Sequence, residues 1–177
     1  GGLNVIAGGT ASTTLQATTT SPRVSVTGDL DFTGIGAGQE AIRSGTSTWY
    51  VSGNVDFTGG AYIAASGNTL SLIGGTVGTL TLSTSTLRSL EISASAAKTF
   101  ASGATTTIAG DFTIVSTSTA PVFTNTTILM TSSSATLAGG AKSLNNFWMV
   151  FKVGCSRRFG NFFREICSDA TKISFLS

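Results

Sequence analysis

The chain has 177 residues, enough for one domain with a sizeable buried interior. Only 10% of the residues are charged, the net charge is +2 and 41% are hydrophobic, so the polarity comes largely from 54 Ser and Thr residues. A disordered chain would combine low hydrophobicity with high net charge, and this composition argues against that class. Because β-branched Thr favours a pleated surface over a helix, we expect an all-β fold.

The charges are unevenly placed along the chain. Residues 1–146 hold five basic and six acidic residues (net −1), whereas residues 147–177 hold five basic and two acidic residues (net +3). The near-neutral first part offers no surface for phosphates, so we expect no nucleic-acid partner. The chain begins without Met and shows neither a signal-peptide pattern nor an apolar run of transmembrane length, so we expect a segment of a longer protein.

A nine-residue motif occurs twice, as VTGDLDFTG at 26–34 and as VSGNVDFTG at 51–59, which is an interval of about 25 residues. Strand alternation places the apolar residues and the Gly of each copy on one face and the Thr, Ser, Asp and Asn on the other. A weaker third copy, TVGTLTLST at 76–84, follows one interval later. The segment IAGDFTI at 108–114 matches the motif out of step, which we interpret as insertions between coils.

A parallel β-helix, which is a solenoid with coils of about 25 residues, explains this interval. One such coil supplies two or three short strands with their turns, and equivalent strands stack at about 4.8 Å. Phe32 is then expected to pack on Phe57, and Leu30 on Val55, as apolar ladders in a narrow interior. The alternative fold is an antiparallel β-sandwich, whose strands need not repeat in sequence.

The segments VTGDLDFTG, VSGNVDFTG, GNTLSLIGGTVGTLTLS and TTTIAGDFTI resemble the Ser/Thr/Gly-rich β-solenoid repeats of large bacterial surface and autotransporter-type adhesin proteins. The resemblance covers residues 24–147. It implies an exported, elongated stalk or adhesive segment at the cell surface, with no fixed catalytic residues to transfer. Surface glycans or other cell-surface molecules are the expected partners.

Residues 147–177 form a tail whose composition differs from that of the expected solenoid domain, residues 1–146. The tail holds six of the 11 Phe, both Cys and half of the basic residues. Four apolar residues with the spacing of one helical face favour an amphipathic helix that caps the last coil (Phe159, Phe162, Phe163 and Ile166). Two other interpretations stay open: a non-native end produced by a frame shift, and a cationic segment bound at a membrane surface.

The sequence contains no His, which excludes Ser-His-Asp and Cys-His catalytic arrangements. We expect no enzymatic activity and no cofactor. Two Cys without His do not favour a zinc site. Cys155 and Cys167 form a disulfide if the tail folds back on itself, but two isolated thiols in such a tail favour the unpaired state.

Asp31 and Asp56 occupy the same repeat position, so a solenoid places them in one column. The first interpretation is that they are solvated residues of the outer face. Together with Asp29 and Asn54 they are candidate oxygen ligands for Ca²⁺, or a carbohydrate contact. The alternative to an adhesive segment is a polysaccharide-active or carbohydrate-binding β-helix, in which Asp31 and Asp56 supply the carboxylate pair.

Three further features bear on the outer surface. Alternation directs one of Trp49 and Tyr50 inward and the other outward, so we expect one in the core and one at its rim, and the alternative is an aromatic platform that binds sugars. The pairs Thr79-x-Thr81 and Thr105-x-Thr107 place hydroxyls on a strand face, as in ice-binding solenoids. An ice-binding function requires these pairs to be aligned on consecutive coils.

Overall fold

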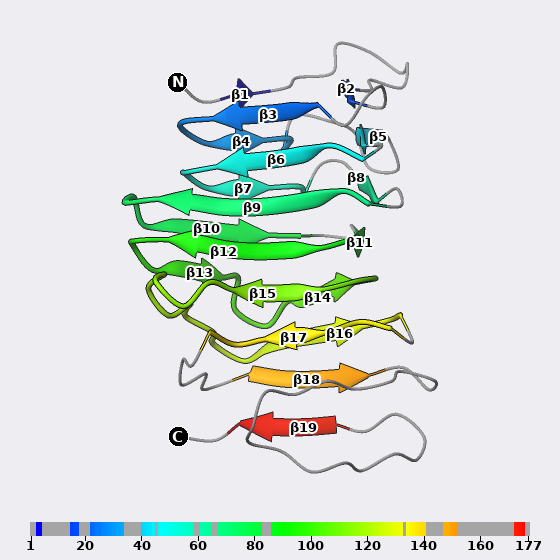
Figure 1. Cartoon of the computed structure of the whole chain (residues 1–177), viewed down its shortest axis with the longest axis vertical. Coiled ribbons are helices and arrows are strands. Elements are labelled where there is room, and N and C mark those ends of the chain that lie inside the picture. The colour runs from blue at the N-terminus through cyan, green and yellow to red at the C-terminus, as the bar shows by residue number, and fades with distance from the viewer. Residues whose placement is uncertain are drawn as a thin grey trace.

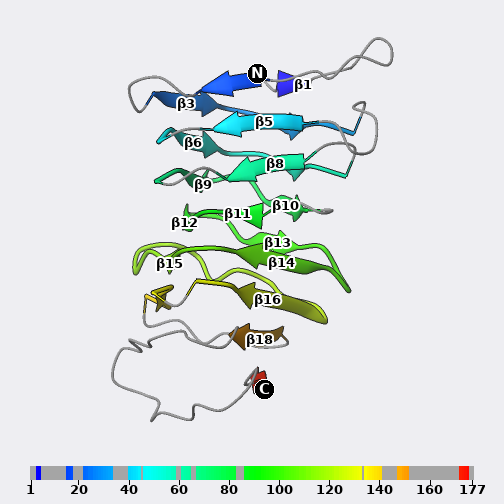
Figure 2. The ribbon, with the colours of Figure 1, turned by 90° about the vertical axis from the view of Figure 1, so that its right-hand side faces the viewer.

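The computed structural model describes residues 3–4, 15–17, 22–33, 40–44, 46–58, 61–64, 67–82, 86–132, 134–140, 147–151 and 172–175. Every helix or strand element in these residues is a β-strand. The strands lie in successive layers from β1 at one end to β19 at the other (Figure 1). The same layered stack is seen after a quarter turn (Figure 2).

The strands form three sheets, here named A, B and C. Sheet A contains, in spatial order, β1 (Leu3–Asn4), β4 (Leu30–Asp31), β7 (Val55–Asp56), β10 (Gly78–Thr81) and β13 (Lys98–Phe100). Sheet B contains β2 (Leu15–Ala17), β5 (Glu40–Ser44), β8 (Ala61–Ala64), β11 (Thr86–Leu87), β14 (Thr105–Ile108), β16 (Thr126–Met130), β18 (Phe147–Phe151) and β19 (Lys172–Phe175). Sheet C contains β3 (Arg23–Val26), β6 (Thr48–Val51), β9 (Thr69–Gly74), β12 (Leu90–Ala94), β15 (Phe112–Ile114) and β17 (Leu137–Ala138).

The chain visits the three sheets in the order C, A, B and then starts the next layer. Thus β3, β4 and β5 belong to one coil, β6, β7 and β8 to the next, and β9, β10 and β11 to the one after. Neighbouring strands from successive coils pair in parallel, as between β6 and β9. The molecule is therefore a parallel β-solenoid of about four turns, about 22 residues apart. The predicted fold class is confirmed, and the antiparallel sandwich is excluded.

The coil length is less regular than the repeated motif suggests. Leu30 pairs with Val55 and Val55 with Leu80 at equal intervals, but Leu80 then pairs with Phe100 after a shorter one. Strand pairing requires only that equivalent strands lie one above the other. The corner segments between strands can therefore change length from coil to coil while the ladder continues.

The core lies inside the three sheets and consists of the alternate residues that point inward. Phe32 and Phe57 are completely buried, and their ring centroids lie 5.3 Å apart. Further along the solenoid Phe100 stacks on Phe123 at 4.6 Å and meets Phe112 edge-on at 6.2 Å. The predicted ladders of Phe32 on Phe57 and of Leu30 on Val55 are confirmed.

The segment IAGDFTI occupies a different corner from the motif that it resembles. In the first copy the Gly-Asp pair joins sheet C to sheet A, because Val26 ends β3 and Leu30 begins β4. In IAGDFTI the pair joins sheet B to sheet C, because Ile108 ends β14 and Phe112 begins β15. Insertions between coils therefore do not explain its shifted position. The same local sequence builds two different corners.

Sheet B continues beyond residue 146. Strand β18 pairs in parallel with β16, with Thr126 opposite Phe147 and Met130 opposite Phe151. Strand β19 then pairs with β18 in the antiparallel direction. The positions proposed for a capping helix and both cysteines lie outside the described residues.

Candidate functional site

The polar residues of the repeated motif form a ladder of hydrogen bonds along the corner between sheets C and A. The Asp29 carboxylate accepts the backbone N–H of Asn54 at 2.7 Å and its side-chain Nδ2 at 3.1 Å. The Asn54 carbonyl oxygen Oδ1 in turn accepts the backbone N–H of Thr79 at 2.9 Å. Each side chain thus satisfies a backbone donor of the next coil. We call Asp29, Asn54 and Thr79 the corner ladder.

The corner between sheets B and C uses the same arrangement. The Asp111 carboxylate accepts both the backbone N–H of Thr136 at 2.9 Å and its hydroxyl at 2.6 Å. Turns expose backbone groups that no strand partner satisfies, and a short carboxylate or amide side chain can accept them. The Gly-Asp pair in the two motif copies that contain it therefore serves one structural purpose at two corners.

Asp31 and Asp56 lie in one column of sheet A, as predicted, because they are direct partners in the register of β4 and β7. Asp31 accepts the backbone N–H of Thr33 at 2.8 Å. Asp56 accepts the backbone N–H and the hydroxyl of Thr58 at 2.8 and 2.7 Å. The backbone N–H and side chain of Thr33 hold the pKa of Asp31 below its usual value.

These contacts bear on the two chemical roles considered for the carboxylates. A general acid for glycoside cleavage needs a raised pKa, whereas the pKa of Asp31 is lowered. For Ca²⁺, one oxygen of Asp29, of Asp31 and of Asp56 already accepts N–H groups, and the Asn54 oxygen faces Thr79. Within the described part of the chain, no three His, Cys, Asp or Glu side chains are grouped so as to hold a metal ion.

The two Thr-x-Thr pairs lie on different sheets. Thr79 and Thr81 belong to β10 in sheet A. Thr79 lies opposite Thr99 of the next coil, and Thr81 lies opposite Asp56 of the preceding coil. Thr105 and Thr107 belong to β14 in sheet B, where they pair with Thr127 and Leu129. The structure therefore does not bring the two predicted pairs together into one hydroxyl array.

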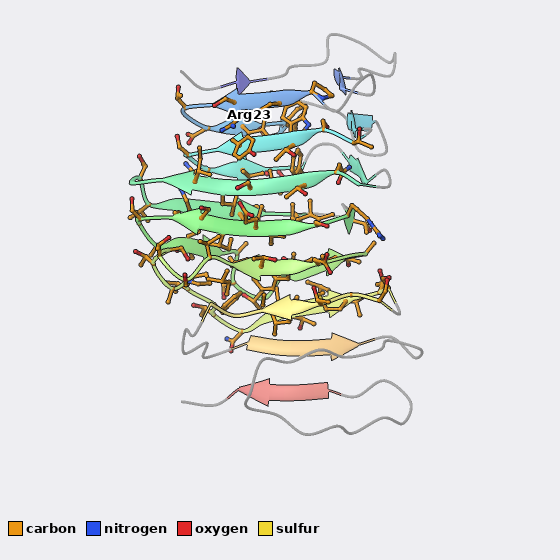
Figure 3. All side chains as sticks on the ribbon, viewed as in Figure 1. Arg23 is labelled. Carbon is orange, nitrogen blue, oxygen red and sulfur yellow. The ribbon has the colours of Figure 1, made fainter. Side chains whose placement is uncertain are left out.

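Trp49 and Tyr50 divide between core and rim as expected. Trp49 is buried, and its indole N–H donates to the Ser47 hydroxyl at 3.0 Å. Tyr50 is half-buried on the outer face of sheet C, and the guanidinium carbon of Arg23 lies 3.9 Å from the centre of its ring. Arg23 lies at the end of the molecule that holds the first coils (Figure 3). The guanidinium therefore occupies part of the ring surface that a stacked sugar would use.

Sequence reasoning missed one buried charged residue, Lys98. This lysine begins β13 in sheet A and is only 1% exposed. Its ammonium donates to the carbonyl oxygens of Ser52 and Thr76. No sequence signal marks this lysine, because its pairing with Gly78, at the place where the motif has Gly, is known only from the register.

Comparisons with protein-family models, with curated proteins and with solved structures give no match for this chain. The fold and the geometry of its corners are therefore established from this chain alone. None of the described segments is a helix with the length and apolar character needed to cross a bilayer.

Proposed function

We propose that this chain is a structural and adhesive segment of an exported bacterial surface protein, in which it acts as a rigid stalk without catalysis. The observation that carries the proposal is the continuous stack itself. Each coil covers the apolar interior of the next, from the Phe32–Phe57 contact to the Phe100–Phe123 contact. A solenoid of this kind gains length by adding coils, and each coil is stabilised by its neighbours.

The hydroxyl-rich composition supports a role outside the protected interior of a cell. Several Ser and Thr hydroxyls bond to backbone carbonyls of the neighbouring coil: Ser52 donates to Thr27 at 2.6 Å, and Thr119 donates to Ser95 at 2.7 Å. These bonds join neutral groups, so salt does not screen them as it screens exposed ion pairs. A stalk built in this way keeps its coils together over a wide range of ionic strength.

A surface-display experiment tests the stalk proposal. The segment is placed between a signal peptide with an epitope tag and an outer-surface anchor, and intact cells are treated with protease. We expect the tag to be exported and to stay attached after treatment that removes it from a matched Phe57→Asp variant, in which a charge is buried in the apolar ladder. Loss of the tag from the parent as readily as from the variant would count against a folded stalk at the surface.

The alternative class, a polysaccharide-active or carbohydrate-binding β-helix, has one observation in its favour, the Asp31–Asp56 column. A glycan array combined with a reducing-sugar assay separates the classes. Binding without release of reducing ends supports the adhesive segment. Turnover that disappears in Asp31→Asn and Asp56→Asn supports the enzyme. If the segment shows no binding and no turnover, the stalk role remains and the adhesive role is rejected.

A further inference from the structure

Lys98 connects three successive coils at the corner between sheets C and A. It lies on β13, while its acceptors lie on the two preceding coils: Ser52 between β6 and β7, and Thr76 between β9 and β10. The ammonium reaches these carbonyls past Gly78, whose missing Cβ would lie 3.3 Å from Nζ and would also collide with the carbonyl of Gly53. Glycine at position 78 therefore lets β10 approach the carbonyl of Gly53 and leaves room beside the ammonium.

Burying the charged ammonium of Lys98 at a corner costs free energy. Burial lowers the pKa of Lys98, which means that the folded protein holds this proton less tightly than the unfolded chain. No carboxylate lies within ion-pair distance of its ammonium among the residues that the structure describes. Buried charged groups are often weak contributors to stability but can select one arrangement among several.

The register between β10 and β13 is a place where such selection is needed. In β10 the residues that point inward are Gly78 and Leu80, and Leu82 follows in the same direction after the strand ends. In β13 the inward residues are Lys98 and Phe100. Because strand faces alternate with a period of two, sliding β13 by two residues keeps every apolar residue inside. Apolar patterning alone would accept Phe100 opposite Leu82 as readily as opposite Leu80.

We propose that Lys98 sets the register of the later coils on the earlier ones. In the observed register the lysine lies opposite Gly78 and its ammonium meets two carbonyls. Slid by two residues it lies opposite Leu80, without the space left by glycine and about 6.6 Å further along the strand. The slipped arrangement buries an ammonium against leucine, and this penalty excludes it.

Disulfide trapping measures the register directly. In a Cys155→Ser/Cys167→Ser background, Thr99→Cys is combined with Thr79→Cys, at its observed partner, or with Thr81→Cys, at its partner after a two-residue slip. Direct partners lie within the Cα separation that a disulfide spans, whereas partners offset by two residues lie beyond about 7 Å. With Lys98 present we expect the 79–99 pair to cross-link on the order of tenfold more than the 81–99 pair.

The same pairs are then examined in Lys98→Met, which keeps the length of the side chain but removes the charge and its donors. We expect cross-linking of the 81–99 pair to rise at least several-fold. Lys98→Gly, which extends the glycine column of Gly53 and Gly78, should behave likewise. Leu82→Met, a conservative apolar change at the residue that follows β10, is the control and should leave both yields as they were.

Two outcomes overturn the proposal. One is an unchanged cross-linking pattern in folded Lys98→Met and Lys98→Gly, which would mean that other contacts set the register. The other is loss of the β-sheet circular dichroism signal in both variants, which would make Lys98 a requirement for folding rather than a selector of register.

Discussion

Phe32 packs against Phe57 of the next coil, with ring centroids 5.3 Å apart and ring planes tilted by 33°. They directly follow β4 and β7, which are neighbours in sheet A with Leu30 opposite Val55 and Asp31 opposite Asp56. Two residues at the same place in successive copies of the motif thus form one rung of the interior. This contact links the repeated motif to the stability of the stack.

We expect Phe57→Ala to destabilise the protein by about 3–5 kcal/mol, because it removes a completely buried ring and leaves a cavity beside Phe32. The measurement is urea unfolding followed by circular dichroism. Phe57→Leu, which keeps most of the apolar volume, is the matched control and should cost about 1–2 kcal/mol. An alanine variant as stable as the leucine variant would show that the ladder carries little of the folding free energy.

The tight corner gives a second prediction, at Gly78. A Cβ added there would collide with the backbone carbonyl of Gly53, which has no flexible end that can move away. We expect Gly78→Ala to cost about 2 kcal/mol or more, since the two coils must separate locally. Gly139→Ala is the control, because a Cβ at Gly139 meets no atom within 4 Å. Similar melting temperatures for the two variants would contradict the close packing at this corner.

The sequence predicted the interior of the solenoid better than its corners. The ladders of Phe32 and Phe57 followed from strand alternation, since an apolar residue at every second position can face only one side. The coil length did not follow, because the motif samples only the longer early coils, while the later pair of Leu80 and Phe100 closes a shorter one. Corner segments carry no periodic signal from which their length could be predicted.

The roles of the polar residues were hidden for a different reason. Alternation assigned Asp29 and Asn54 to the outer face, but at a corner the side chain points along the stack toward the next coil. Alternation likewise gave no reason to expect a buried Lys98, because a lysine in a short strand is normally solvated. It lies opposite Gly78, a residue of the preceding coil whose proximity becomes clear only once the register is known.

Asn54 provides a test of the corner ladder that depends on pH. In Asn54→Asp the Nδ2 donor to Asp29 is lost and two carboxylates approach each other. This repulsion raises the pKa of the introduced carboxyl in the folded state, so its protonated form supports folding at low pH and that support is lost as pH rises through the raised pKa. We expect the variant to be less stable than the parent at pH 7 by about 1–2 kcal/mol and to approach it near pH 4.

The measurement for Asn54→Asp is the melting temperature between pH 4 and 8. Asn54→Ala is the companion variant, because it removes the acceptor of the Thr79 N–H and the Nδ2 donor to Asp29 without adding charge. Its deficit should change less with pH than that of the aspartate variant. Parallel pH profiles for the aspartate variant and the parent would mean that Asp29 and position 54 do not interact as the structure has them.

Asp31 gives a prediction of the opposite sign. Its pKa is lowered first by the backbone N–H of Thr33 and second by the Thr33 side chain, so its contribution to stability is present above the unfolded value of 3.8 and is lost as pH falls through the folded value. Because the carboxylate is largely solvated, we expect that contribution to stay below about 1 kcal/mol. A carboxyl NMR titration should show Thr33→Val retaining more than half of the lowering, since the variant keeps the N–H. A complete return to the ordinary pKa would assign the effect to the hydroxyl.

The fifth prediction concerns Ca²⁺ at Asp29, Asp31, Asn54 and Asp56. Hard cations need several oxygens that converge on one point, but here the Asp29 oxygen is turned toward the Asn54 amide and the Asn54 oxygen toward Thr79. A site that uses these two oxygens would compete with the corner ladder, so we expect millimolar CaCl₂ to shift the melting temperature by no more than about 1 °C relative to EDTA. A larger rise that disappears in Asp31→Asn and Asp56→Asn would show that the cation recruits the outer column and that the ladder yields to it.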